Sequence, residues 1–212
     1  MYIPRSNAEE RVDVMLDYIE AHPLGALVTI SSEGLFATHL PLLIDRTRGE
    51  LGTLQGHLAR ANPHHRHRAT AEALVIFSGP DAYITPSWYA AKQEHGKVVP
   101  TWNYVAVHAY GTLTFIDDES FLRPHLRALV TRHESGRDAP WAIDDAPDQY
   151  IDQQLRAIVG VEVAIAHLEG KWKMSQNRSS ADIDGVVHGL GASTNPVDRV
   201  VAEVVAERKP LA

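Results

Sequence analysis

The order of apolar and polar residues along this chain predicts a β-rich protein. Residues 26–31 and 35–44 are β-prone runs separated by turn residues at 32–34, so a β-hairpin is expected there. Four later runs also have the composition or alternation of strands, at residues 51–56, 73–77, 105–116 and 161–168. Short strands of this kind, separated by turns, are typical of a sheet that closes into a barrel.

An amphipathic helix is predicted before the first strand. Ser6 and Glu9 have the spacing of a capping box, and Pro23 ends the apolar pattern that follows. The residues that would share the buried face of this helix are Val12, Met15, Leu16 and Ile19.

Three further helices are predicted in the second half of the chain. Residues 118–132 are expected to be helical with a late start or a kink, because Pro124 would cost about 3 kcal/mol in a helix interior. A short helix follows at residues 149–158. The last helix begins after Asn195 as N-cap, with Pro196 in its first position. The glycine-rich residues 185–193 are expected to form a flexible loop.

Composition is that of an ordinary globular protein, with 44% hydrophobic and 22% charged residues among 212. No linker composition divides the chain, so one domain over residues 1–212 with a C-terminal helical extension is expected. The absence of cysteine excludes disulfides, thiolate nucleophiles and cysteine-based zinc sites. No leader pattern and no apolar run of about 20 residues is present, so we expect a cytoplasmic protein without a membrane span.

The net charge of −7, without any block of Lys and Arg, makes direct binding of duplex DNA doubtful. His64 and His67 form an i, i+3 pair, but no carboxylate or third ligand lies at a recognisable spacing, so no metal site is expected.

Four polar and aromatic segments are the candidates for chemistry: residues 56–64 (GHLARANPH), 84–89 (ITPSWY), 99–104 (VPTWNY) and 171–178 (KWKMSQNR). The first offers glycine and small residues for close backbone approach to a phosphate or ribityl chain. The two aromatic segments suit a planar cofactor. The last is the densest basic cluster and suits a phosphate.

Structural roles for the same segments stay open. Asn62 and Pro63 have the pattern of an N-cap and first helical residue. The tryptophans and tyrosines are compatible with a core or a dimer interface, and the alternating lysines with the solvated face of a strand.

The four segments, in this order, resemble the PaiB family of FMN-binding negative transcriptional regulators over nearly the whole chain. The resemblance implies a mainly β fold with α (α+β), namely a six-stranded antiparallel split β-barrel with flanking helices, similar to pyridoxamine-phosphate-oxidase-like proteins. It also implies a homodimer and bound FMN. The chain has His-Leu-Ala-Arg at residues 57–60 where those oxidases have a Ser-Arg-Lys phosphate triplet, so phosphate must be bound differently here.

We expect the basic segment and the first segment to line one anionic-ligand site, with the aromatic segments at the flavin ring. The predicted cofactor-binding residues are Thr38, His39, His57, Arg60, Asn62, Ser87, Trp88, Tyr89, Thr101, Trp102, Asn103, Lys173, Gln176, Asn177 and Arg178.

The resemblance implies a regulator, and the charge argues that it acts indirectly, through flavin redox state, a metabolite or a protein partner. An FMN-dependent oxidoreductase is the alternative, with His39, His57 or Tyr89 handling protons. Haem bound through a histidine in the same cleft is a third possibility.

Overall fold

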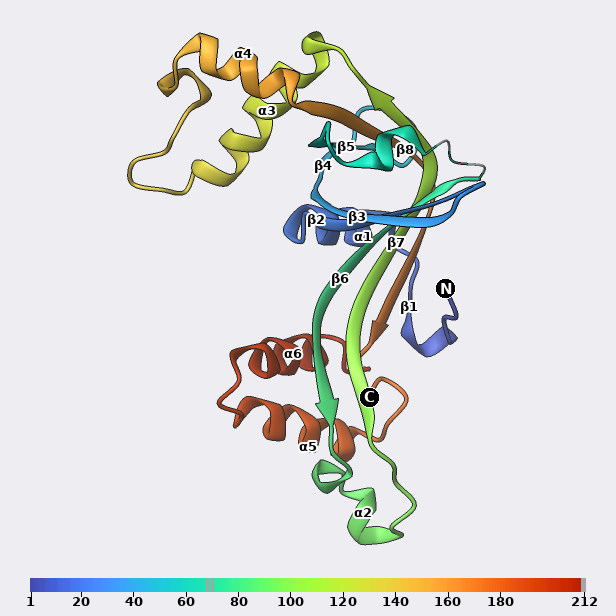
Figure 1. Cartoon of the computed structure of the whole chain (residues 1–212). Coiled ribbons are helices and arrows are strands. Elements are labelled where there is room, and N and C mark those ends of the chain that lie inside the picture. The colour runs from blue at the N-terminus through green and yellow to red at the C-terminus, as the bar shows by residue number, and fades with distance from the viewer. Residues whose placement is uncertain (68, 70, 211–212) are drawn as a thin grey trace. The chain divides into compact units, whose positions relative to one another are not determined.

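The computed structural model describes residues 1–67, 69 and 71–210, and Figure 1 shows the course of the chain. These residues contain eight β-strands and six α-helices, which confirms the mainly β fold with flanking helices. The strand order is β3-β2-β6-β7-β8-β5-β4, and β1 pairs with β8. The two strands beyond the predicted six are β1 (Ala8–Glu9) and β4 (Leu43–Asp45). They have two and three residues, too few for a recognisable alternation.

Internal contacts divide the chain into two compact units. Unit 1 comprises Met1–Met15, Ser78–Val107 and Glu169–Ala212, and unit 2 comprises Leu16–Phe77 and His108–Leu168. Three long strands contribute residues to both units: β6 (Ala73–Ile84), β7 (Thr101–Ile116) and β8 (Ile158–Lys173).

The predicted hairpin opens unit 2. Strands β2 (Leu24–Ser31) and β3 (Gly34–Pro41) pair antiparallel along their whole length. Gly34 has a φ of 108°, which a glycine adopts without the steric cost of a side chain. Strand β5 (Thr53–Ala59) pairs with β4 on one side and β8 on the other. The strands of unit 2 enclose a core whose fully buried members include Leu27, Leu54, Val75, Phe77, Val161 and Val163.

Two helices of unit 2 form a smaller apolar cluster. Helix α3 (Glu119–Glu134) starts at once, because the Asp118 carboxylate accepts a hydrogen bond from the Ser120 amide at 2.8 Å. The prediction of a late start was therefore wrong, and the helix continues through Pro124. Helix α4 (Asp148–Arg156), a short helix that the sequence predicted, packs against α3. The buried residues of this cluster are Leu122, Ile143, Ile151 and Leu155.

Helices α5 (Ser180–Gly191) and α6 (Pro196–Glu207) pack together in unit 1 (Figure 1). Helix α6 begins as predicted, with the Asn195 side chain accepting from the Val197 amide at 3.0 Å. The predicted flexible loop at residues 185–193 was wrong, because most of it is the end of α5. Its buried face carries Ile183, Val186 and Leu190, so apolar packing outweighs the low helix propensity of glycine.

The N-terminal capping box was also wrong. Ser6 lies in a 3-10 turn (Arg5–Asn7) and Glu9 lies in β1, although helix α1 (Val12–Ala21) forms where the apolar spacing predicts it. Glu9 instead accepts hydrogen bonds from the backbone and side chain of Arg11. No helix among the described residues combines the length and apolarity needed to cross a bilayer.

Candidate functional site

Three of the four candidate segments meet within unit 1. Lys173, the last residue of β8, donates hydrogen bonds from Nζ to the Thr101 hydroxyl and to the Trp102 carbonyl. Thr101 and Trp102 are the first residues of β7, so part of the predicted aromatic loop is strand. Burial lowers the pKa of the Lys173 ammonium, and the charges of Lys171 and Arg178 lower it further.

The turn after β8 is fixed by amide side chains. The Asn103 amide donates to the Ser175 hydroxyl at 3.0 Å, and both residues are buried. Ser175 has a φ of 64°, a left-handed conformation that is uncommon for a residue with a side chain. Gln176 holds the turn from within: its Oε1 accepts from the Met174 amide at 2.7 Å, and its Nε2 donates to the Trp172 carbonyl. Asn177 is exposed on the same turn.

Arg178 joins the first aromatic segment to this turn. Its guanidinium carbon lies 4.6 Å from the centre of the Tyr89 ring, a cation–π contact. Tyr89 is 2% exposed, and its hydroxyl makes no hydrogen bond of regular geometry with any described residue. Burial raises the pKa of this phenol, although the charge of Arg178 opposes the shift.

Trp88 packs against helix α5. A Cβ atom added to Gly185 would lie 1.9 Å from the Trp88 carbonyl oxygen, and one added to Gly189 would lie 2.3 Å from the indole. The two glycines, four residues apart on one helix face, form the groove that receives this side chain. Ser87 is exposed, and its hydroxyl accepts from Lys92 at 3.1 Å.

Three cations lie around this turn, and the buried carboxylate of Asp182 also acts on Tyr89. Lys171 is 8% exposed and its Nζ lies 5.1 Å from the centre of the Tyr104 ring. Within the described part of the chain, neither Lys173 nor Arg178 forms an ion pair with a carboxylate. Partly buried cations that lack an ion pair are suited to an anion.

The remaining predicted residues lie in unit 2, where they form two separate arrangements. In the first, His64 is fully buried and its two ring nitrogens each lie 2.8 Å from a threonine hydroxyl, Thr29 and Thr38. Asn62 donates to Thr38 at 3.1 Å and also accepts from the His64 amide, which confirms its N-cap role. His39 is exposed on β3.

In the second arrangement, His57 Nδ1 lies 3.2 Å from His125 Nε2. His125 is 4% exposed, no described residue hydrogen-bonds its Nδ1, and the Phe121 ring stacks on it. Burial lowers the pKa of both imidazoles, that of His125 to about 4 with the charge of His57 as the second cause. Arg60 makes a bidentate ion pair with Asp117.

The prediction that the residues of the two units line one site stays a prediction. Sequence reasoning overlooked Lys171 and Ser175, although both lie inside the segment it selected. His125 was not predicted either, because its position in a helix does not indicate that it faces His57.

The donor set of unit 1 fits FMN. A phosphate needs cations and neutral donors, and the side chains of this type in unit 1 include Lys173, Arg178 and the Tyr89 hydroxyl. The exposed ring of Trp102 offers apolar surface in the same unit. It contacts the Tyr83 ring edge-on, with 6.1 Å between the ring centroids.

Sequence comparisons place the chain in a family. The family model described as "Putative FMN-binding domain" matches residues 1–167. The chain is 32% identical over 213 residues to the Protease synthase and sporulation protein PAI 2 of Bacillus subtilis, with 98% of each chain covered. It is 34% identical over 254 residues to an uncharacterised protein of Aspergillus fumigatus, covering 98% of this chain and 97% of that one.

Solved structures share the fold at low sequence identity. The flavocytochrome Anf3 from Azotobacter vinelandii superposes with a TM-score of 0.58 at 16% identity, covering 81% of this chain and 72% of that one. The FAD and haem binding protein from Mycobacterium smegmatis gives 0.57 at 18% identity, covering 84% and 79%. These likenesses confirm the split β-barrel. The chain thus belongs to the family of putative FMN-binding domains of the PaiB type, and FMN is the cofactor that this membership assigns to it.

Proposed function

We propose that the phosphate of FMN binds in unit 1 to Lys173, Arg178 and the hydroxyl of Tyr89. The observation that carries this proposal is that neither cation forms an ion pair with a described carboxylate, while Arg178 lies over the ring of Tyr89, whose buried hydroxyl lacks a regular hydrogen bond to any described residue. A phosphate monoester carries close to two negative charges at neutral pH and accepts several hydrogen bonds. When bound, FMN supplies electron and hydride transfer, while the protein orients it and tunes its surroundings.

The turn with these cations lies beyond the residues that match the family model, at 171–178. It lies within the 98% of the chain that aligns with the Bacillus relative. The proposal therefore extends the cofactor site into the C-terminal part of the chain.

Titration of the apoprotein with FMN, followed by quenching of flavin fluorescence, tests the proposal. Lys173→Gln should weaken FMN binding by about 10- to 100-fold, the loss expected for one charged hydrogen bond. Lys209→Gln is the matched control, because Lys209 lies in the same unit but pairs with Asp184. Equal FMN affinity of the two variants would contradict the proposal.

We propose that the biological role is negative regulation of transcription that acts indirectly, through flavin redox state or a protein partner, in the cytoplasm. The name of the Bacillus relative, which refers to protease synthesis and sporulation, supports a regulatory role. The charge of −7 argues against direct contact with the phosphate backbone. Nanomolar binding of the purified protein to a defined operator at physiological salt would contradict the indirect route.

An FMN-dependent oxidoreductase is the alternative function. The exposed imidazole of His39 is a side chain available for proton transfer to a small substrate, whereas the Tyr89 hydroxyl is buried. An absorbance spectrum of the purified protein separates bound flavin from haem. Rapid reduction of that flavin by NAD(P)H, with turnover of an acceptor, would favour the enzyme.

We also propose a homodimer. The outward face of the β2-β3 hairpin is largely apolar, with Val28 opposite Ala37 and Ile30 opposite Leu35, and it also carries His39. Leu24 and Leu35 are 62% and 76% exposed. A second copy of the chain would cover this face, since exposed contiguous apolar surface of this kind marks protein interfaces.

A further inference from the structure

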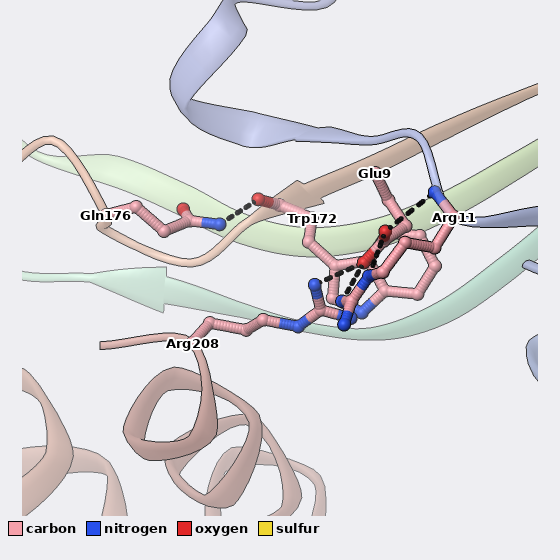
Figure 2. A network of polar contacts seen from close by, with 5 residues as sticks. All are labelled: Glu9, Arg11, Trp172, Gln176 and Arg208. Atoms are coloured by element: carbon pink, nitrogen blue, oxygen red, sulfur yellow. Dashed lines mark hydrogen bonds and ion pairs between the residues drawn. The ribbon is translucent and has the colours of Figure 1, made fainter. Parts of the chain in front are cut away.

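Glu9 is a buried carboxylate at which two distant parts of unit 1 meet. Its side chain is 3% exposed. It accepts hydrogen bonds from the Arg11 amide at 3.0 Å and the Arg11 Nε at 2.8 Å, and a further one from Arg208 (Figure 2). These interactions lower the pKa of the Glu9 carboxyl to about 2, so it stays charged at all ordinary pH values.

Arg208 also contacts strand β8. Its guanidinium carbon lies 4.8 Å from the centre of the Trp172 ring, which is 5% exposed (Figure 2). Trp172 stands between Lys171 and Lys173 in the sequence. A planar cation held by a carboxylate and stacked on an indole fixes the position of that ring.

The turn that follows Trp172 is joined to the same residue. Gln176 donates to the Trp172 carbonyl at 2.5 Å, so the turn closes onto the same residue that Arg208 contacts (Figure 2). Ser175 adopts a left-handed conformation, which persists only where the surroundings impose it. The Arg178 amide then donates to the Ser175 carbonyl at 2.9 Å, which places Arg178 at the end of the turn.

We infer that Glu9 is a positioning residue for the FMN phosphate: through Arg208 and Trp172 it fixes the turn that carries Lys173 and Arg178. This inference rests on the proposed function. It makes a prediction opposite in sign to simple electrostatics. Removal of the Glu9 charge makes unit 1 more positive, which by itself would tighten the binding of an anion. Loss of positioning would weaken it.

Glu9→Gln tests the inference, with FMN and riboflavin titrated separately at a temperature where circular dichroism shows the variant folded. We expect about 10-fold weaker binding of FMN with unchanged stoichiometry, and riboflavin affinity within about twofold, because only the phosphate is mispositioned. General damage to the fold would weaken both ligands. Asp184→Asn is the matched control, since it removes one charge and the exposed ion pair with Lys209. It should leave both affinities unchanged.

Unchanged or tighter FMN binding by Glu9→Gln would overturn the inference. Should that variant not fold, Arg208→Lys keeps the charge but loses the planar stack, and FMN affinity should fall about threefold to tenfold. Unaltered affinity of Arg208→Lys would overturn the inference equally. A wild-type protein without FMN affinity would overturn the proposed function as well, whereas normal wild-type affinity with unaffected variants would overturn the inference alone.

Discussion

At the scale of single residues, the hydroxyl of Tyr89 is a buried donor that the proposed phosphate would satisfy. The group makes no regular hydrogen bond with any described residue, which costs about 1–3 kcal/mol of stability. Buried groups of this kind are often satisfied by an ordered water, an ion or a ligand. Because Arg178 lies over the Tyr89 ring, the proposed function makes that ligand an anion.

Tyr89→Phe should therefore have opposite effects on stability and on binding. Without ligand, the free energy of unfolding should rise by about 1 kcal/mol, because an unsatisfied buried hydroxyl is removed. FMN affinity should fall by roughly fivefold to tenfold. Tyr83→Phe is the control, because Tyr83 is half exposed. Urea denaturation and FMN titration would contradict the account if Tyr89→Phe lost stability and bound FMN normally.

The buried His125 predicts a dependence of stability on pH. Its pKa is about 4 in the folded protein, against an ordinary value of 6.5. Between these values the unfolded chain binds more protons, so the free energy of unfolding should fall as pH drops from about 6.5 to 4, by on the order of 3 kcal/mol. Above about pH 6.5 this contribution is fully present.

Urea denaturation at a series of pH values measures this effect. His125→Gln should flatten the slope in that window, whereas His133→Gln, at an exposed position of the same helix, should leave it unchanged. An identical slope in His125→Gln and the wild type would refute the assignment.

At the scale of elements, helix α5 and Trp88 fit together through two glycines. Gly185 approaches the Trp88 carbonyl and Gly189 approaches the indole, so that a methyl group on either would clash. Gly185→Ala or Gly189→Ala should cost about 1–3 kcal/mol of stability through overpacking.

Gly191→Ala is the internal control for this contact, because no atom lies within 4 Å of its added Cβ. Alanine there should be neutral or stabilise by a few tenths of a kcal/mol up to about 1 kcal/mol. Equal melting temperatures for Gly185→Ala and Gly191→Ala would show that the contact with Trp88 does not contribute to stability.

The elements that could be predicted from the sequence are those with local signals. The β2-β3 hairpin has its turn residues, and α6 has Asn195 and Pro196 at its start. Helix α5 could not be predicted, because its packing against Trp88 is a tertiary effect that outweighs glycine propensity. Strand β6 extends through residues 78–84, whose polar and glycine residues hid it.

The candidate site was only partly foreseeable for a similar reason. Residue types identified the segments, so a contact between Lys173 and Thr101 could be predicted from the sequence. Arg178 stacks on Tyr89, and Gln176 closes the turn, only because the fold brings these residues together. No spacing of residues in the sequence indicates either contact.

At the scale of the whole molecule, the apolar face of the β2-β3 hairpin should hold two copies together. Leu35→Glu places a charge on this face, and each copy of a dimer would bring one. Light scattering should give about twice the chain mass for the wild type and a monomer for the variant. Val197→Glu, at an exposed position of α6, should leave the mass unchanged. A wild-type monomer at micromolar concentration would contradict the proposal.

The central claim, that Lys173 and Arg178 hold the phosphate of FMN, is tested most directly by the ratio of the dissociation constants of riboflavin and FMN. Riboflavin lacks only the phosphate, so this ratio isolates its contribution. In the wild type we expect riboflavin to bind at least about 100-fold more weakly than FMN. In the double variant Lys173→Gln/Arg178→Gln the ratio should collapse to within about fivefold, with riboflavin affinity itself little changed. A ratio that stays at its wild-type value in the folded double variant would show that the phosphate binds elsewhere.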